Sequence, residues 1–265
     1  MRILTATAPT NWRDLQDQVG LVLDECGFDV EVEKTVSTAR GTVELDILAE
    51  ETVQGRRYSI ACECKHWRSR VDQSVIHAFR TVVADLGLNL GYIISTSEFQ
   101  AGAFPAAELT NIRLYTWEAF QDTFCETWLE KHFVPMVTRE LDPLFSYTEP
   151  LVPSWFLEVS EADKQALRDL REKHLPLGRL AMSFTSYARF ATQTPFRQLP
   201  LRESLGSWMR DPSELPAPVL DATGYRDLLQ VILQLGKDAI AEFREIKMRA
   251  GCGKADAKLP NGESR

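Results

Sequence analysis

Three acidic residues in this sequence are followed two positions later by lysine, a spacing that lets a carboxylate and an ammonium group serve one reaction. The three pairs are Glu63–Lys65, Glu245–Lys247 and Asp256–Lys258. The second pair lies in a helical pattern, where residues two apart point to nearly opposite sides. The third lies in a polar terminal tail. Only the first pair falls in a strand-like segment, where residues two apart share a face, so only this pair is placed to act on one substrate.

The segment before this pair brings two further carboxylates to the same face. Two strand-like segments flank Gln54-Gly55, a pair of residues typical of a hairpin turn. A hairpin that turns there places Asp46 opposite Glu63, and Glu44 opposite Lys65. The alternating apolar residues then point to the other face: Val43, Leu45, Ile47, Ile60, Cys62 and Cys64.

This arrangement of carboxylates predicts a metal site. Directly opposed side chains in a sheet have Cβ atoms about 4.5–5.5 Å apart, and two carboxylates at that distance repel by about 3 kcal/mol at an effective dielectric of about 20. A divalent cation reverses the sign of this interaction. Hard oxygen ligands that leave room for water suit Mg²⁺, with Mn²⁺ as an alternative. Asp46 and Glu63 are the expected metal ligands, Lys65 the group that orients the attacking water, and Glu44 either an accessory contact or a partner for Lys65.

The elements that must position these residues predict an α/β fold. Thr10 is the expected N-cap of the first helix, which presents Trp12, Leu15, Val19 and Val22 on one face. Asp72 is the expected cap of the second helix. The predicted elements are, in order, a helix at 10–28, strands at 29–36, 42–50 and 56–64, a helix at 72–87, a strand at 90–95, a helix at 97–110, a strand at 112–116 and a helix at 117–133. This αβββαβαβα order predicts a mixed central sheet with flanking helices.

Three sequence blocks in this order resemble a known family. They are GFDVEVEKTVSTARGTVELDILAE, YSIACECKHWRSRVDQSVIHAF and GYIISTSEFQAGA. Together with Asp46 and the Glu-x-Lys segment, they resemble the PD-(D/E)XK nuclease superfamily, and most closely its Mrr-type restriction endonuclease branch. The resemblance covers about residues 10–120 and implies a restriction-endonuclease-like αβββαβ core. It also implies a metal-dependent phosphodiesterase in which Asp46 and Glu63 hold the metal and Lys65 assists the nucleophile.

The resemblance implies two accessory positions as well. Many relatives carry a further glutamate on the first helix, and the nearest equivalent here is Gln16, a neutral amide. Gln73, at the start of the second helix, stands where many relatives carry a polar residue near the site. The biological setting implied by the family is restriction of foreign or modified DNA, a form of antiviral defence.

A short basic segment follows the Glu-x-Lys pair. His66, Trp67, Arg68 and Arg70 are candidates for nucleic-acid contacts, with the cations positioning phosphates. Trp67 would either stack on a base or pack under the loop. A solvated loop without function is the plain alternative, and His66 could also serve as a general base.

Charge, cysteine content and hydropathy limit the classes of function. Residues 1–135 carry 12 Lys and Arg against 20 Asp and Glu, a net charge of −8, and the remaining residues carry 18 of each. Affinity for nucleic acid must therefore come from a local basic patch or from bound metal. Five cysteines without paired spacing suit reduced thiols in the cytoplasm. No apolar run approaches the length of a membrane span and no secretory signal is recognised.

The spacing of Cys62 and Cys64 would suit a zinc or redox pair, but no second Cys/His pair accompanies it, and both residues fall on the apolar face. They are expected to be small core residues. His77, His132 and His174 have no ligand partners at suitable spacing and receive no role.

The second half of the chain differs from the first in composition and in its predicted secondary structure. Ten of the 13 prolines lie between Pro135 and Pro218. We expect a nuclease domain at 1–134, a proline-rich, partly helical connecting region at 135–220, a helix at 221–251 and a disordered tail at 252–265. A polar helix capped by Ser160 lies in the connecting region. Dimerisation, docking of a partner protein and target recognition all remain open for this mostly helical region.

The sequence therefore predicts a cytoplasmic Mg²⁺-dependent endonuclease that acts on DNA. Two alternatives use the same fold. The first is a non-catalytic module that binds nucleic acid or protein, which the neutral Gln16 keeps open. The second is a nuclease directed at RNA.

Overall fold

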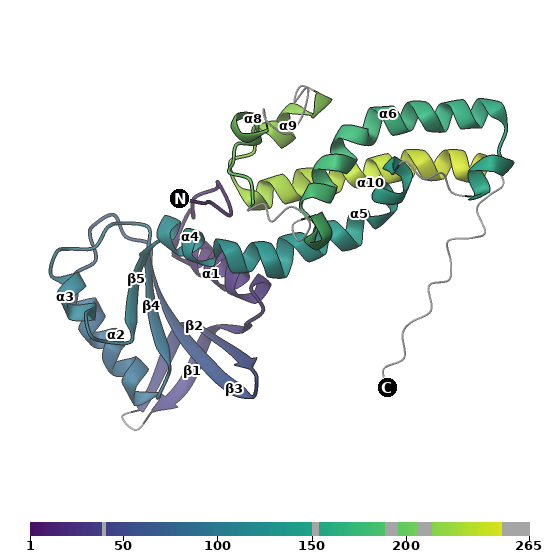
Figure 1. Ribbon diagram of the computed structural model, residues 1–265. Coiled ribbons are helices and arrows are strands. Elements are labelled where there is room, and N and C mark those ends of the chain that lie inside the picture. The colour runs from purple at the N-terminus through teal and green to yellow at the C-terminus, as the bar shows by residue number, and fades with distance from the viewer. Residues whose placement is uncertain (39–40, 150–153, 189–195, 206–213, 251–265) are drawn as a thin grey trace. The chain divides into compact units, whose positions relative to one another are not determined.

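The computed structural model describes residues 1–38, 41–149, 154–188, 196–205 and 214–250 (Figure 1). The chain divides into two compact units, Met1–His132 and Phe133–Arg265. Within the described ranges, no helix is long and apolar enough to cross a membrane. The tail predicted at 252–265 lies outside these ranges.

The first unit has the predicted order of helices and strands. Its elements are α1 (Trp12–Glu25), β1 (Asp29–Thr38), β2 (Gly41–Val53), β3 (Arg56–Lys65), α2 (Gln73–Asp85), β4 (Leu90–Ser95), α3 (Ala103–Ala107), β5 (Ile112–Thr116) and α4 (Trp117–Trp128). The strands form one sheet in the order β1-β2-β3-β4-β5. The first three strands are antiparallel and the last two run parallel to β3, so the predicted mixed α/β sheet is confirmed.

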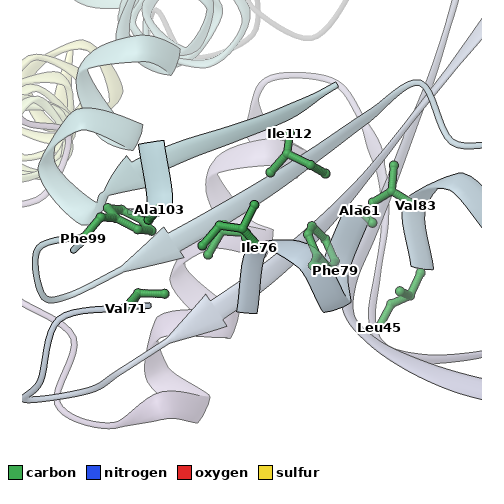
Figure 2. Packing of buried hydrophobic residues seen from close by; sticks show 10 residues of the cluster. Leu45, Ala61, Val71, Ile76, Phe79, Val83, Phe99, Ala103 and Ile112 are labelled. Carbon is green, nitrogen blue, oxygen red and sulfur yellow. The ribbon is translucent and has the colours of Figure 1, made fainter. Parts of the chain in front are cut away.

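Helices cover both faces of this sheet (Figure 1). Helices α2 and α3 contact each other and pack against β4 and β5, whereas α1 and α4 contact each other and α1 packs against β1, β2 and β3. The core under α2 and α3 is shown in Figure 2. Its buried members are Leu45, Ala61, Val71, Ile76, Phe79, Val83, Ile93, Phe99, Ala103 and Ile112.

The turn between β2 and β3 has the predicted chemistry. Gln54 and Gly55 both have positive φ, 50° and 77°, as a two-residue hairpin turn with a right-handed strand twist requires. This turn sets the register of the strands that carry the candidate site.

Two details of the predicted helices need correction. Asn11, not Thr10, is the N-cap of α1, because its side chain accepts the backbone N–H of Asp14, and Thr10 hydrogen bonds to the Asp14 carboxylate instead. Trp12 is exposed rather than part of the buried face, since it precedes the first turn that packs on the sheet.

The third predicted helix is also shorter than expected. Only Ala103–Ala107 is helical, because the chain around Gln100 is held in extended backbone pairing with the segment at Val71. At the other end of the unit, α4 continues into a π-helical turn, Leu129–Phe133.

The second unit is a helical layer. Its longer elements are α5 (Val134–Thr148), α6 (Glu161–Ser183) and α10 (Tyr225–Arg249), accompanied by a 3₁₀ turn at Ser154–Glu158 and short helices α8 (Leu201–Ser204) and α9 (Ala217–Leu220). The three long helices pack against one another. Gly236 permits one close approach, because a Cβ there would lie 2.4 Å from a methyl group of Leu141.

Helix α5 was not predicted from the sequence. Pro135 occupies the first turn of α5, where its missing N–H is no loss, but Pro143 lies inside the helix and costs a backbone hydrogen bond. Burial of Val137, Leu141 and Leu144 offsets this cost. The Ser160 cap of α6 is confirmed, with its hydroxyl accepting the N–H of Asp163.

Candidate active site

Asp46 lies at the point where β2 and β3 separate. The antiparallel ladder between these strands runs from the turn to Ile47↔Cys62, in the register predicted from the turn. Beyond this pair, the Asp46 Oδ2 atom accepts the backbone N–H of Cys64 at 2.7 Å. The carboxylate thus takes the place of a backbone acceptor, which fixes one of its oxygens against the end of β3.

Side-chain alternation in β2 is interrupted at Asp46. Leu48 pairs with Ala61 and packs against the cluster under α2. Leu45 belongs to the same cluster (Figure 2), although strict alternation would place a residue three positions away on the opposite face. The prediction that Leu45 shares a face with Ile47 is therefore wrong.

The irregularity extends to the neighbouring strand. Glu33 stands where β1 would pair with Asp46, and its φ of 54° lies in the left-handed region that non-glycine residues rarely adopt. The β1–β2 pairing passes directly from Val32↔Ile47 to Lys34↔Leu45. Strain of this kind gathers at functional sites when the surrounding structure imposes it.

Glu44 does not lie opposite Lys65. It pairs with Thr35 of β1 and its side chain is exposed. Lys65 pairs instead with Ser95 of the parallel strand β4. The predicted opposition of Glu44 and Lys65 is wrong because β2 leaves β3 at Asp46, two residues before the pair would form.

Glu63 and Lys65 lie close together at the end of β3. The Lys65 ammonium group donates to a Glu63 carboxylate oxygen, and the two side chains are 19% and 24% exposed for the lysine and the glutamate. Asp46 is near enough to act electrostatically on the Glu63 carboxyl group. The structure therefore brings Asp46, Glu63 and Lys65 together.

The electrostatics of Glu63 are unusual for a carboxylate that touches a lysine. Burial raises the pKa of Glu63, the hydrogen bond from Lys65 lowers it, and the negative charge of Asp46 raises it again. The net direction is upward. A buried carboxyl group whose charged form is disfavoured, beside a second carboxylate, is typical of catalytic and metal-binding sites.

The donors at this site fit a small hard cation. Within the part of the chain that the structure describes, no group of three or more His, Cys, Asp or Glu side chains is placed to hold a metal. Mg²⁺ needs fewer protein ligands, because it keeps several waters and takes one or two carboxylates together with substrate phosphates. Asp46 and Glu63 supply that donor set.

Gln16 offers a further oxygen atom that a bound ligand could satisfy. It lies on α1, which packs against β2 and β3, and it is only 4% exposed. Its amide oxygen is buried and has no hydrogen-bond partner among the described residues. Such an atom costs about 1–3 kcal/mol unless a ligand satisfies it. No hydrogen bond joins it to Asp46 or Glu63 in the described ranges, so an accessory role for Gln16 stays a prediction.

Gln73 begins α2 and is exposed. Its amide oxygen lies beside Gly102, where an added Cβ would come within 3.1 Å of it. The side chain thus lies against the chain that leads into α3, and its accessory role also stays a prediction.

Cys62 and Cys64 are core residues. Both are buried, and burial raises the pKa of both thiols. Because the thiolate is the form that binds metals and reacts, these protonated thiols agree with the interpretation as small apolar residues.

The basic segment forms a rim beyond the end of β3, which we define as His66, Trp67, Arg68 and Arg70. The last three side chains are exposed, and within the described structure neither guanidinium group has a hydrogen-bond or ion-pair partner. Both are therefore available to phosphates. One ring nitrogen of His66 lies 3.2 Å from the carbonyl oxygen of Pro9, which ties this side chain to the N-terminal segment.

Three hydroxyl residues that hold this rim were missed in the sequence. The Ser97 hydroxyl donates to the carbonyl of Ser69 at 2.8 Å and lies 3.1 Å from the Ser95 hydroxyl. The backbone N–H of Thr96 donates to the carbonyl of Lys65 at 3.0 Å. A run of small hydroxyl residues at the carboxyl end of a buried strand was the available signal.

Backbone pairing secures the far end of the rim. The N–H of Val71 donates to the carbonyl of Glu98 at 3.0 Å, and the N–H of Gln100 donates to the carbonyl of Val71 at 2.9 Å. The rim is thus anchored at both ends by the chain that follows β4.

A comparison with known proteins finds a family match within the first unit. Residues 8–124 match the family model Mrr_cat, described as restriction endonuclease. Two solved structures are similar: the protein of unknown function AF1548, at 20% identity over 68% of this chain and 98% of that one with a TM-score of 0.38, and the DNA modification-dependent restriction endonuclease AspBHI, at 11% identity over 48% of this chain and 40% of that one with a TM-score of 0.23. No curated protein matches. Both TM-scores are low, so the likeness to restriction endonucleases depends on the family match.

Proposed function

We propose that this protein is a cytoplasmic, metal-dependent endonuclease that hydrolyses DNA phosphodiester bonds in restriction of foreign or modified DNA. The match of residues 8–124 to the restriction endonuclease family Mrr_cat supports this proposal. Asp46, Glu63 and Lys65 are the proposed catalytic residues. The observation that carries this assignment is the grouping of three side chains at the end of β3: Lys65 donates to Glu63, both are largely buried, and Asp46 is held there by the N–H of Cys64. The raised pKa of Glu63 agrees with this grouping.

Each of the three residues has a distinct task. Asp46 and Glu63 would hold Mg²⁺ or Mn²⁺, the kind of ion that restriction endonucleases generally use. When bound, such an ion polarises a phosphoryl oxygen and lowers the pKa of water. Asp46 keeps its orientation through the N–H of Cys64. Lys65 orients the attacking water and stabilises the charge that develops on the phosphate.

The basic rim supplies the affinity that the rest of the first unit lacks. Residues 1–135 carry a net charge of −8, which repels a polyanion. Among the described residues, Arg68 and Arg70 are exposed cations without acidic partners, and they lie on a backbone segment that is anchored next to Lys65. We propose that they position the phosphate backbone at the carboxylates.

One experiment tests both the reaction and the substrate. Plasmid DNA, single-stranded DNA and RNA are incubated with the purified full chain in Mg²⁺, Mn²⁺ or EDTA, alongside Asp46→Ala and Lys65→Ala. We expect metal-dependent cleavage of DNA that each substitution slows by at least about 10²-fold. Cleavage at the wild-type rate in both variants would refute the site, and cleavage of RNA alone would refute the substrate.

A non-catalytic module on the same fold is the second candidate, and the neutral Gln16 on α1 is the observation that favours it. In that case all three nucleic acids would stay intact while the protein still bound one of them. A homodimer or a partner protein held through the second unit stays a prediction, which sedimentation of the full chain would test.

A further inference from the structure

Trp67 is the one member of the basic rim that lies directly against a proposed catalytic residue. The Lys65 ammonium nitrogen is 5.3 Å from the centroid of the Trp67 ring, within the range of a cation–π interaction. The Trp67 side chain is 41% exposed, so burial in the core does not explain its position.

We propose that Trp67 is a positioning residue for Lys65, an inference that rests on the proposed function. The indole ring holds the lysine over the site, and its effect on cleavage passes through the lysine rather than through a contact with DNA.

The need for such a residue follows from the chemistry of lysine. Its ammonium group is a compact charge on a flexible four-carbon stem, which without contacts samples many positions. Within the described part of the chain, two groups restrain it, the Glu63 carboxylate and the Trp67 ring. Glu63 is also a proposed metal ligand, so a bound cation competes with Lys65 for this carboxylate. The Trp67 ring is neutral and does not take part in that competition.

The local backbone is anchored in a way that suits this task. Trp67 lies between Lys65, whose carbonyl accepts the N–H of Thr96, and Ser69, whose carbonyl accepts the Ser97 hydroxyl. The ring is therefore attached to a short segment that is fixed on both sides. A tryptophan that only stacks on a base does not need a contact with Lys65, whereas a tryptophan that positions Lys65 requires that contact.

Trp12 provides a matched control. It is also exposed and also carries a cation over its ring, with the Arg13 guanidinium 5.1 Å from the centroid. It lies on α1 and has no part in the proposed site. Trp12→Ala thus removes the same kind of side chain and contact without touching Lys65.

The test is a double-mutant cycle of Trp67→Ala and Lys65→Ala, with Trp67→Phe and Trp12→Ala. Single-turnover cleavage rates at saturating duplex, and duplex affinity in EDTA, are measured for each. We expect Trp67→Ala to slow cleavage about fivefold, as about 1 kcal/mol of cation–π interaction predicts. We expect Trp67→Phe to keep most of the wild-type cleavage rate. The duplex affinity of both Trp67 variants should stay within about twofold of the wild-type value. In the Lys65→Ala background, Trp67→Ala has no further effect, and Trp12→Ala matches the wild type.

A second readout does not depend on activity. Thermal or urea unfolding in EDTA measures the same cycle as a coupling between the two side chains, expected at up to about fivefold in the unfolding equilibrium constant. Additive effects in this cycle would overturn the contact, and additive effects on the rate would overturn the positioning role.

The outcomes separate this inference from the proposed function. If Lys65→Ala cleaves at the wild-type rate, the proposed function fails and the positioning role fails with it. If Lys65→Ala cleaves slowly but Trp67→Ala weakens duplex binding and leaves the rate at saturation unchanged, the function stands. Trp67 is then a base contact, and the positioning role is refuted.

Discussion

Two contacts between lysine and glutamate, one in each unit of the chain, leave the glutamate with pKa shifts in opposite directions. Lys173 binds Glu242 on the helical unit, with side chains 58% and 38% exposed, and the hydrogen bond from Lys173 lowers the pKa of Glu242, helped by His174. Lys65 binds Glu63 in the first unit, yet the pKa of Glu63 is raised. The lysine lowers the pKa of the glutamate in both places, but at Glu63 other effects outweigh the lysine.

The difference comes from burial and from the third group. Glu242 is partly solvated and its second neighbour, His174, is a donor. Glu63 is more buried, and its second neighbour is the carboxylate of Asp46. A fold that needed only stability would not place two carboxylates there. The comparison therefore separates a structural pair from a candidate active site without reference to any family.

The largest expected effect is on cleavage, and it contrasts the two lysines. We expect Lys65→Ala to slow plasmid cleavage by about 10²–10³-fold, the usual loss when a group that stabilises the transition-state charge is removed. Lys173→Ala should cleave at the wild-type rate within about twofold. Equal losses in both variants would mean that the Lys65 effect reflects stability alone.

The second effect is stabilisation by metal, measured by thermal unfolding. At Mg²⁺ about tenfold above its Kd, the protein gains about 1.4 kcal/mol, or roughly 3–6 °C in Tm for a domain of this size. Asp46→Ala should lose this gain, whereas Glu242→Gln should keep it. A gain that persists in Asp46→Ala would place the metal elsewhere.

The third effect is the cost of charging Glu63 in EDTA. Its pKa is raised on folding, so ionised Glu63 destabilises the fold at neutral pH, and this cost disappears below the unfolded value of about 4.3. We expect Glu63→Gln to raise Tm by roughly 2–4 °C near pH 7, a gain that fades as the pH falls towards 4. A lower Tm at pH 7 would show that the Lys65 contact outweighs burial and Asp46.

The smallest effect has the opposite sign and belongs to Glu242. Its pKa is lowered on folding, so the pair with Lys173 stabilises above the unfolded value of about 4.3 and is lost as the pH falls through the folded pKa. Solvent screens this exposed pair, so Glu242→Gln should cost at most about 1 kcal/mol near pH 7 and nothing in acid. A stabilising substitution here would remove the contrast with Glu63.

Much of the first unit could be predicted because its signals are local. The Gln54-Gly55 turn fixed the β2–β3 register as far as Ile47↔Cys62, and strand periodicity placed Glu63 and Lys65 together. The separation of β2 from β3 at Asp46 could not be predicted from local signals. It depends on the hydrogen bond from the Cys64 N–H to Asp46 and on the backbone conformation of Glu33 in β1. Because of this separation, Glu44 does not lie opposite Lys65 as predicted.

The other features that the sequence did not predict also depend on contacts between segments that are distant in the chain. The hydroxyl groups of Ser95 and Ser97 matter because of where Ser69 lies in space, which periodicity does not encode. Helix α5 was missed because Pro143 breaks the local pattern, and tertiary packing of residues such as Leu141 overrides that penalty. Local rules found the strands and the chemistry, but not the contacts between distant segments.

The central claim is tested most directly by the single-turnover rate of duplex cleavage in Mg²⁺ for wild type, Asp46→Asn and Glu50→Gln. Glu50 lies on the same strand as Asp46, but its carboxylate forms an ion pair with Arg57. Its substitution therefore removes a β2 carboxylate that is not part of the site. We predict metal-dependent cleavage that Asp46→Asn slows by at least about 10²-fold and Glu50→Gln leaves within about twofold. Cleavage by Asp46→Asn at the wild-type rate would contradict the account.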